Sequence, residues 1–262
     1  MLILGDCLEV MPTLPAGSID LTVTSPPYDN LRTYNDSLND WTPAKWRAII
    51  AELYRLTKPG GVVVWVVGDA TVNGSETGVS FQQALHAMGC GFSLHDTMIY
   101  QKKNPTPYCH NRYQPCFEYM FVWSKGKPAV FNGMRVAAKN AGVASRLNQR
   151  GVTGDITDGN GKGKPVRDDK LRENVWQYGV GFGVSTTYKE AFEHPAIFPE
   201  ALAADHITSW SNPGDVVFDP FLGSGTTGKM AAATGRKFIG IERDPTYFEI
   251  ARKRVEPLPW EV

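Results

Sequence analysis

The stretch VVFDPFLGSGTTGKMAAATGRKFIGIE, residues 216–242, decides the fold. It contains an apolar run at 216–218, a glycine-rich loop, a run of small residues and a second apolar run at 238–241. Short apolar runs bounded by turn residues are typical of buried strands, and the segment between them has helix-forming composition. The stretch therefore predicts a strand, a loop, a helix at 229–233 and a second strand, which is the repeating unit of an α/β fold with a parallel sheet.

The loop inside this unit is typical of a cofactor site. Gly223, Gly225 and Gly228 satisfy the GxGxxG spacing, and Glu242 ends the following strand. Glycines allow a ligand to approach the backbone closely, and a carboxylate can accept hydrogen bonds from both hydroxyls of a ribose. The unit therefore predicts an adenosine-bearing cofactor.

Two other ligands use similar loops. The sequence also fits GxxxxGK, but Met230 follows where a nucleoside-triphosphate site needs a Ser or Thr hydroxyl for magnesium. NAD would use the same glycines and the same acid, although the sequence has no evident hydride-transfer partner. An NAD-binding oxidoreductase therefore stays as an alternative.

A second motif, TSPPY at residues 24–28, directly follows the apolar run 19–23. Two consecutive prolines cannot continue a sheet ladder, so a stiff loop leaves the sheet here, at the strand end where ligands of open α/β sheets bind. Ser25 and the loop carbonyls are acceptors for an amino group, and Tyr28 offers a ring for a planar heterocycle. A proline-rich turn with a surface tyrosine is the alternative interpretation.

Strand and helix patterns alternate through the rest of the first half of the chain. We expect a strand at 2–4, a helix that begins at Pro43 with Thr42 as its cap, a buried strand at 62–67, a helix at 81–88, and strands at 92–100 and 117–123. This alternation indicates an α/β doubly wound sheet with helices on both faces.

Length, charge and cysteine content limit the classes of protein. The 262 residues, 42% of them hydrophobic, fit one sizeable domain or one domain with an insert. A formal net charge of zero excludes attraction of polyanions by a global field, so nucleic-acid affinity needs a local basic patch. Four cysteines without scaffold spacing and the lack of any long apolar run favour a cytoplasmic protein without membrane association. The spacing of Cys109, His110 and Cys116 matches no common zinc pattern, so no metal is expected.

The region 132–172 differs in composition from the rest of the chain. It is rich in Gly and Asn and contains nine basic residues against four acidic ones. A flexible loop could have this composition, but basic residues among Asn, Gln and Ser are also what phosphate and base-edge contacts require. Together with a segment after the 92–100 strand, this region supplies the candidate DNA contacts Lys102, Lys103, Arg112, Arg135, Lys139, Arg146 and Arg150.

TSPPY, the FLGSGTT motif preceded by Asp219 and Pro220, and the HPAIFP run at 194–199 together resemble the DNA amino-methyltransferases that use S-adenosylmethionine. The order of the motifs, with TSPPY first and FLGSGTT last, resembles the beta class of that family. The resemblance covers nearly the whole chain except the insert. It implies a circularly permuted, Rossmann-like seven-stranded methyltransferase sheet. Its parts would be a catalytic half at 1–131, a target-recognition insert at 132–185 and a cofactor-binding half at 186–262.

The same resemblance implies a role for each motif. The catalytic loop is Ser25, Pro26, Pro27 and Tyr28. Asp6 is expected to face the adenine of the cofactor, and Glu242 to hold its ribose. The remaining cofactor residues are Thr24, His194, Phe198, Asp219, Phe221, Gly223, Ser224, Gly225, Thr226 and Thr227. Ordinary turn or capping chemistry is the alternative for each of them.

The expected reaction follows from the chemistry of an exocyclic amino group, which is a poor nucleophile because its lone pair is delocalised into the base ring. Hydrogen bonds to Ser25 and to the Pro26 carbonyl would localise the lone pair, and the base must be flipped out of double-stranded DNA. In the resembled family, serine before the two prolines favours cytosine N4, with adenine N6 as the alternative. A catalytically inactive DNA-binding protein is a third class. A homodimer, a cognate restriction endonuclease and a bacterial or phage origin stay open.

Overall fold

The computed structural model describes residues 1–27, 41–105, 107, 111–193, 197 and 199–256 of the chain. The chain forms two compact units. The first is made of Met1–Asn132 and Asn174–Val262 and contains the large sheet, and the second is Gly133–Glu173. None of the helices within the described ranges is long and apolar enough to cross a membrane.

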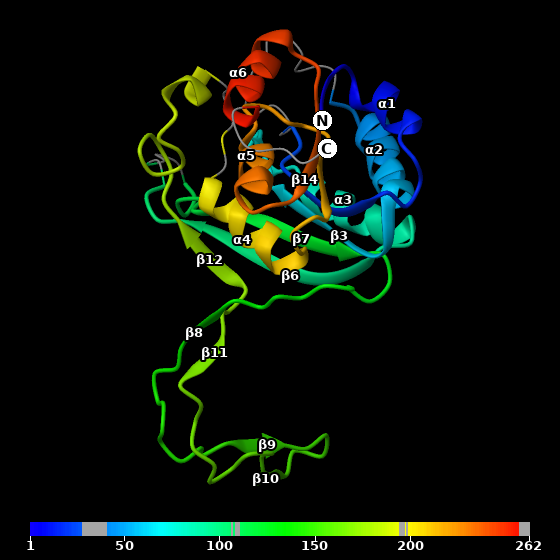
Figure 1. Ribbon diagram of the computed structural model, residues 1–262. Coiled ribbons are helices and arrows are strands. Elements are labelled where there is room, and N and C mark those ends of the chain that lie inside the picture. Colours follow the sequence, from blue (N-terminus) through cyan, green and yellow to red (C-terminus); the bar gives the residue numbers. More distant parts are fainter. Residues whose placement is uncertain (28–40, 106, 108–110, 194–196, 198, 257–262) are drawn as a thin grey trace. The chain divides into compact units, whose positions relative to one another are not determined.

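An eight-stranded sheet forms the centre of the first unit (Figure 1). Its strand order is β1 (Leu2–Leu4), β14 (Lys237–Glu242), β13 (Val216–Asp219), β2 (Ile19–Thr24), β3 (Thr57–Val67), β7 (Phe117–Ser124), β6 (Ser93–Lys102) and β12 (Val175–Tyr178). All neighbours are parallel except the two pairs that β7 makes with β3 and β6. Strands from the end of the chain lie between β1 and β2, as the predicted circular permutation requires.

The sheet has one strand more than the seven that the family resemblance implied. The additional strand is β12, which pairs with β6 in the register Val175↔Ile99 and buries Trp176 and Tyr178. Residues 174–185, which were expected in the insert, lie within the first unit, and the bounds of the insert stay a prediction. Four residues that follow a Gly-rich region give too short an alternation to be recognised from the sequence.

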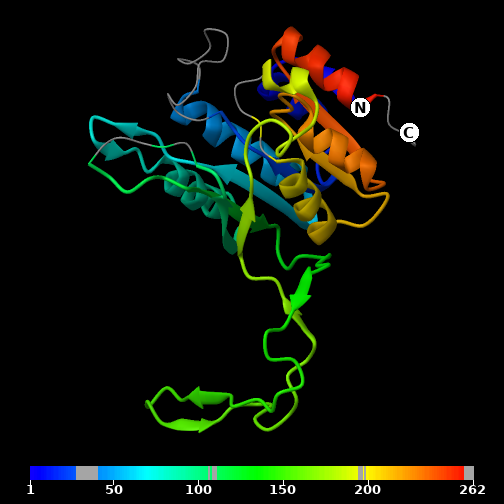
Figure 2. The ribbon, with the colours of Figure 1, turned by 90° about the vertical axis from the view of Figure 1, so that its left-hand side faces the viewer.

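The helices form where the local sequence predicts them. Thr42 caps α2 (Pro43–Leu56), with its hydroxyl oxygen accepting from the Lys45 N–H at 3.4 Å. α3 (Val79–Gly89) packs with α2 on one face of the sheet. On the other face, α4 (Glu200–Trp210) packs with α5 (Thr226–Ala233) (Figure 2). The remaining elements of this unit are α1 (Cys7–Val10), η1 (Met11–Thr13), β4 (Thr71–Val72), β5 (Ser75–Glu76), η3 (Lys189–Glu193) and α6 (Pro245–Val255).

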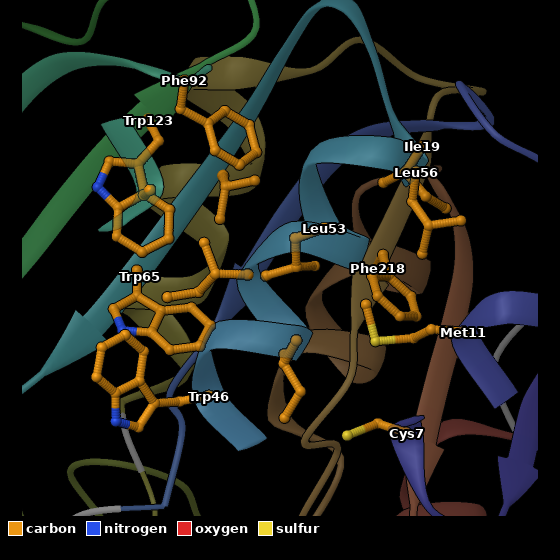
Figure 3. Close-up of a cluster of buried hydrophobic side chains, with 14 of the residues drawn as sticks. Cys7, Met11, Ile19, Trp46, Leu53, Leu56, Trp65, Phe92, Trp123 and Phe218 are labelled. Carbon is orange, nitrogen blue, oxygen red and sulfur yellow. The ribbon is translucent and has the colours of Figure 1, made fainter. Parts of the chain in front are cut away.

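The main hydrophobic core lies between the sheet and α2 (Figure 3). Trp46 and Leu53 of α2 are buried together with Trp65 of β3 and Trp123 of β7. The rings of Trp65 and Trp123 stack with their centroids 5.4 Å apart, and Trp65 Nε1 donates to Gln83 Oε1 at 2.8 Å. Large buried aromatic side chains dominate the energetics of a core. The core therefore stabilises β3, the strand next to β2.

The second unit is built from two antiparallel strand pairs. These are β8 (Arg135–Ala137) with β11 (Asp169–Leu171), and β9 (Asn148–Arg150) with β10 (Ile156–Asp158). Among its residues, all of which the structure describes, no apolar side chain is buried. Isolated two-stranded hairpins are marginally stable in water. The unit therefore lacks a hydrophobic core of its own.

Candidate active site

The two motifs meet at the carboxyl ends of two neighbouring strands. β2 pairs with β13 in the register Phe218↔Thr22, and each strand runs into one of the predicted loops. Thr24 Oγ1 donates to Asp219 Oδ1 at 2.6 Å, and Thr227 Oγ1 donates to the carbonyl oxygen of Val23 at 3.1 Å. The diproline loop and the glycine loop are therefore adjacent in space.

The diproline loop begins directly at this contact. Ser25 and Pro27 are half-buried and Pro26 is buried, whereas Thr24 is fully inside the structure. Because proline fixes φ and restricts the preceding residue, the Ser25–Pro26–Pro27 backbone has little freedom. Tyr28 lies outside the described residues, so its stacking role stays a prediction.

The Asp219 carboxyl lies at the centre of the contact between the loops. Its Oδ1 also accepts from the Phe221 N–H at 3.0 Å. Burial raises the pKa of Asp219 to about 7, the charge of Glu242 adds to this, and hydrogen bonds from Thr24, Phe221 and Thr227 oppose it. Asp219 therefore holds the two loops together with a carboxyl group that titrates near neutral pH.

Glu242 is fixed at the end of β14 with acceptor capacity to spare. Its Oε2 accepts from the Gly223 N–H at 2.8 Å and its Oε1 from the Asp244 N–H at 2.9 Å. Burial raises the pKa of Glu242. A carboxylate has about four acceptor sites. The group can therefore accept a hydroxyl in addition to these backbone contacts, as a ribose site requires.

The three glycines of the loop are required for different physical reasons. Gly223 and Gly225 have φ of 51° and 85°, which side chains rarely adopt. A Cβ at Gly225 would lie 3.0 Å from Ala251 Cα, and one at Gly228 would lie 2.7 Å from Phe238 Cε1. The later two glycines therefore permit packing on α6 and β14, and Gly223 is the one whose backbone lies beside Glu242.

The helix after this loop begins earlier than the sequence suggested. We expected it from Lys229, but α5 starts at Thr226, directly after Gly225. A helix N-terminus and a bare glycine backbone next to a carboxylate form an arrangement that suits a nucleoside-bearing ligand. The residues present therefore fit an adenosine-bearing cofactor.

The positions of the other residues expected at the cofactor leave their roles as predictions. Asp6 follows β1 next to Glu242, because the Gly5 N–H donates to the Glu242 carbonyl at 2.8 Å. Its Oδ1, however, accepts from the Leu8 N–H at 2.8 Å and caps α1, so its adenine contact stays a prediction. Phe221 packs edge-on against Trp41, with 5.5 Å between ring centroids. His194 and Phe198 lie outside the described residues.

Three of the candidate DNA contacts already have partners within their own unit. Lys102 pairs with Glu118 at 2.6 Å, Arg112 with Glu76 at 3.5 Å, and Arg135 Nε with Asp169 at 2.6 Å. The side chains of Lys103, Lys139, Arg146 and Arg150 are exposed. The first three would have to exchange a carboxylate for a phosphate, so the four exposed residues are the stronger candidates.

The sequence analysis missed two residues beside the glycine loop. Arg254 near the end of α6 donates to the Ser224 side chain at 2.9 Å, and Glu200 at the start of α4 pairs with Arg254 at 2.8 Å. Neither residue belongs to a motif, so no local signal could have identified them. Among the residues that the structure describes, no group of three or more His, Cys, Asp or Glu side chains is placed to hold a metal ion.

Comparison with known proteins identifies the family. A family model for N6 and N4 methyltransferases, described as DNA methylase, matches residues 19–253. The chain belongs to this DNA methylase family. Orphan methyltransferase M.BamHII of Bacillus amyloliquefaciens is 50% identical over 262 residues, which cover 97% of this methylase and 91% of that protein. DNA adenine methyltransferase YhdJ of Escherichia coli is 28% identical over 259 residues, covering 96% and 81%.

Solved structures agree with this membership. The complex of M1.HpyAVI with SAM has a TM-score of 0.60 at 27% identity and covers 97% of this methylase and 98% of that chain. The cytosine-N4-specific PvuII DNA methyltransferase has a TM-score of 0.71 at 20% identity, covering 97% and 85%, and supports the fold alone. The predicted fold class, the methyltransferase activity and the S-adenosylmethionine cofactor of the family are confirmed, and an NAD-binding oxidoreductase is excluded.

Proposed function

We propose that this methylase transfers a methyl group to N4 of a cytosine flipped out of duplex DNA, with adenine N6 as the alternative base. The observation that supports the proposal is the 2.6 Å hydrogen bond between Thr24 and Asp219, which places Ser25 beside the glycine loop. The choice of cytosine depends on Ser25, because serine before the two prolines favours cytosine in the family that the motif resembles.

The chain's own residues activate and orient the amino group. The Ser25 hydroxyl and the Pro26 carbonyl accept its two N–H groups, which localises the nitrogen lone pair on the side that faces the glycine loop. The two prolines fix these acceptors in advance, so little reorganisation is needed at the moment of reaction. When bound at the glycine loop and Glu242, S-adenosylmethionine would supply an activated methyl group.

The second unit, Gly133–Glu173, is proposed to recognise the target sequence. Its residues include nine Lys or Arg and five Asp or Glu, a local excess of four positive charges in a chain with no net charge. The exposed β9–β10 hairpin has the width that the major groove of B-DNA admits. Arg146 and Arg150 are proposed as phosphate contacts in this unit, with Lys139 as a further one.

The biological setting is proposed from the same observations. A relative that is 50% identical is named an orphan methyltransferase, which favours a solitary modification enzyme over one paired with a restriction endonuclease. DNA is the partner, and a bacterial or phage enzyme would meet it in the cytoplasm. A homodimer and a cognate endonuclease stay as predictions.

A nucleoside analysis tests the target base. The protein is incubated with duplex DNA and S-adenosylmethionine labelled in its methyl group, and the DNA is digested and separated by chromatography. Label in N4-methylcytosine is the expected result. Label in N6-methyladenine would support the alternative base, and absence of transfer by a protein that binds the cofactor would contradict the proposed activity.

A further inference from the structure

Arg254 connects the glycine loop to the first residue of α4 through one buried guanidinium group. Its side chain is 1% exposed. Nη1 donates to the carbonyl oxygen of Ser224 and, at 2.9 Å, to the Ser224 hydroxyl oxygen. Nη2 donates to Glu200 Oε1 at 2.8 Å. The glycine loop and the start of α4 are thus held by the same planar group.

The contact acts on the part of the loop that has the most backbone freedom. Ser224 lies between Gly223 and Gly225, which both have positive φ. Glycine has more backbone conformations available than any other residue when no contact constrains it. The Ser224 carbonyl would therefore have several orientations within reach, and the guanidinium fixes one of them. Gly223, the adjacent residue, makes the backbone contact with Glu242.

Glu200 extends the same network to the helix start. Its Oε1 also accepts from Lys229 Nζ of α5 at 2.7 Å. Burial tends to raise the pKa of Glu200, but hydrogen bonds from Lys229, Thr186 and Arg254 hold it below its ordinary value. Glu200 is therefore ionised and is shared by two cations. It directly follows the 194–199 run that the resemblance placed over the cofactor.

A buried cation in this place needs a reason beyond stability. Moving a charged group out of water costs several kcal/mol, and a buried ion pair is often no more stabilising than well-packed apolar residues, although it can specify one geometry. The tyrosine ring of Tyr188 lies 5.7 Å from Arg254 Cζ and encloses the group further. Through Glu200, Lys229 and Arg254, the network joins α4, α5 and α6.

We propose that Arg254 is a positioning residue for methyl-donor binding, which fixes the glycine loop at Ser224 and the start of α4 at Glu200 in one mutual spacing. The inference rests on the proposed use of this loop for S-adenosylmethionine. Lysine is a poor substitute, because a single ammonium group lacks the planar fork that reaches both acceptors.

The test compares Arg254→Lys with a matched control, Arg236→Lys. Arg236 is also buried and also donates to backbone and hydroxyl oxygens, namely the Ser211 carbonyl at 2.7 Å and the Ser211 hydroxyl at 3.1 Å. It lies just before β14, at the opposite end of that strand from Glu242. Both substitutions are expected to lower the melting temperature, but only one touches the cofactor loop.

Titration calorimetry with S-adenosylmethionine measures the effect on binding. Arg254→Lys is expected to raise the Kd and the KM for S-adenosylmethionine about tenfold or more, with DNA affinity unchanged, and Arg236→Lys to stay within about twofold of wild type. Glu200→Gln keeps Arg254 and the side-chain volume, so it is expected to shift the same Kd in the same direction and by less. It replaces Arg254→Lys in the comparison if that variant does not fold.

The outcomes separate this inference from the proposed function. Wild-type protein that binds no S-adenosylmethionine overturns the proposed use of the loop, and this inference with it. Wild-type binding together with an unchanged Kd in Arg254→Lys, or in Glu200→Gln where that variant replaces it, overturns the positioning role alone. Equal weakening by the Arg254 and Arg236 substitutions also overturns it, because the effect would then be a general loss of stability.

Discussion

The hydroxyl of Thr24 donates a 2.6 Å hydrogen bond to the carboxyl group of Asp219, although the two residues are 195 positions apart in the chain. Both side chains are almost completely excluded from solvent. The bond joins the strand that leads into the diproline loop to the strand that leads into the glycine loop. The spacing between the diproline loop and the glycine loop is therefore set by the first and last parts of the sequence together.

Removing the Thr24 hydroxyl tests whether this bond stabilises the site. We expect Thr24→Val to lower the free energy of unfolding by about 1–3 kcal/mol. Valine has nearly the same volume as threonine, but the buried Asp219 carboxyl group loses a hydrogen-bond donor. Urea unfolding followed by fluorescence measures the change.

The matched control for this substitution lies on the same strand. Thr22 is equally buried, but its hydroxyl has no hydrogen-bond partner among the described residues. Thr22→Val is therefore expected to leave the stability unchanged or to raise it. An equal loss of unfolding free energy in Thr24→Val and Thr22→Val would show that the hydrogen bond to Asp219 does not stabilise the protein.

The raised pKa of Asp219 predicts a pH dependence of stability with a definite sign. The pKa is about 7 in the folded protein, whereas the ordinary value is 3.8. Between these values the unfolded chain loses its proton and the folded protein keeps it, so stability falls as the pH rises. The contribution of this carboxyl group is fully present below pH 3.8, is lost progressively as the pH rises toward 7, and is constant above that.

Asp219→Asn separates this group from the other acids. The amide oxygen can still accept from Thr24 and from the Phe221 N–H, but the side chain no longer titrates. We expect the stability of the wild type, relative to Asp219→Asn, to decrease from pH 5 to pH 7 in urea unfolding. If stability changed with pH in parallel in the two proteins, the carboxyl group of Asp219 would not be buried in its protonated form.

The parts of the fold that the sequence predicted are those with local signals. Paired prolines, spaced glycines and short apolar runs mark β2, β13 and β14 and the loops that follow them, because each signal acts within a few residues. β12 was missed because it has only four residues, and one alternation of exposed and buried positions is too short a signal. Arg254 was missed for another reason: its partners Ser224 and Glu200 are 30 and 54 positions away.

Ser25 offers a test of the catalytic loop that leaves cofactor binding intact. Ser25→Ala removes one proposed acceptor for the target amino group, and we expect the single-turnover rate of methyl transfer to fall about 10- to 1000-fold. The Kd for S-adenosylmethionine should not change, because the glycine loop and Glu242 are untouched. Rapid-quench kinetics with saturating DNA measures the rate. A rate close to wild type would show that the hydroxyl does not contact the reacting group.

The exposed arginines of the second unit predict a change in the salt dependence of DNA binding. Each phosphate contact adds about 0.9 to the slope of log K against log salt concentration. The double substitution Arg146→Ala and Arg150→Ala is therefore expected to reduce the slope by about 2 and to weaken binding to all sequences alike. Fluorescence anisotropy with a labelled duplex at several salt concentrations gives the slope.

Arg252→Ala is the control for this measurement. Arg252 has 42% of its side-chain surface exposed, but it lies on α6 and pairs with Glu249 and Glu256 at 2.9 Å. Its loss changes the net charge without removing a proposed phosphate contact, so the slope should stay as in the wild type. An equal reduction by Arg252→Ala would mean that the slope reports overall charge. An unchanged slope in the double variant would exclude both arginines from the DNA interface, and recognition would then have to depend on other residues of Gly133–Glu173.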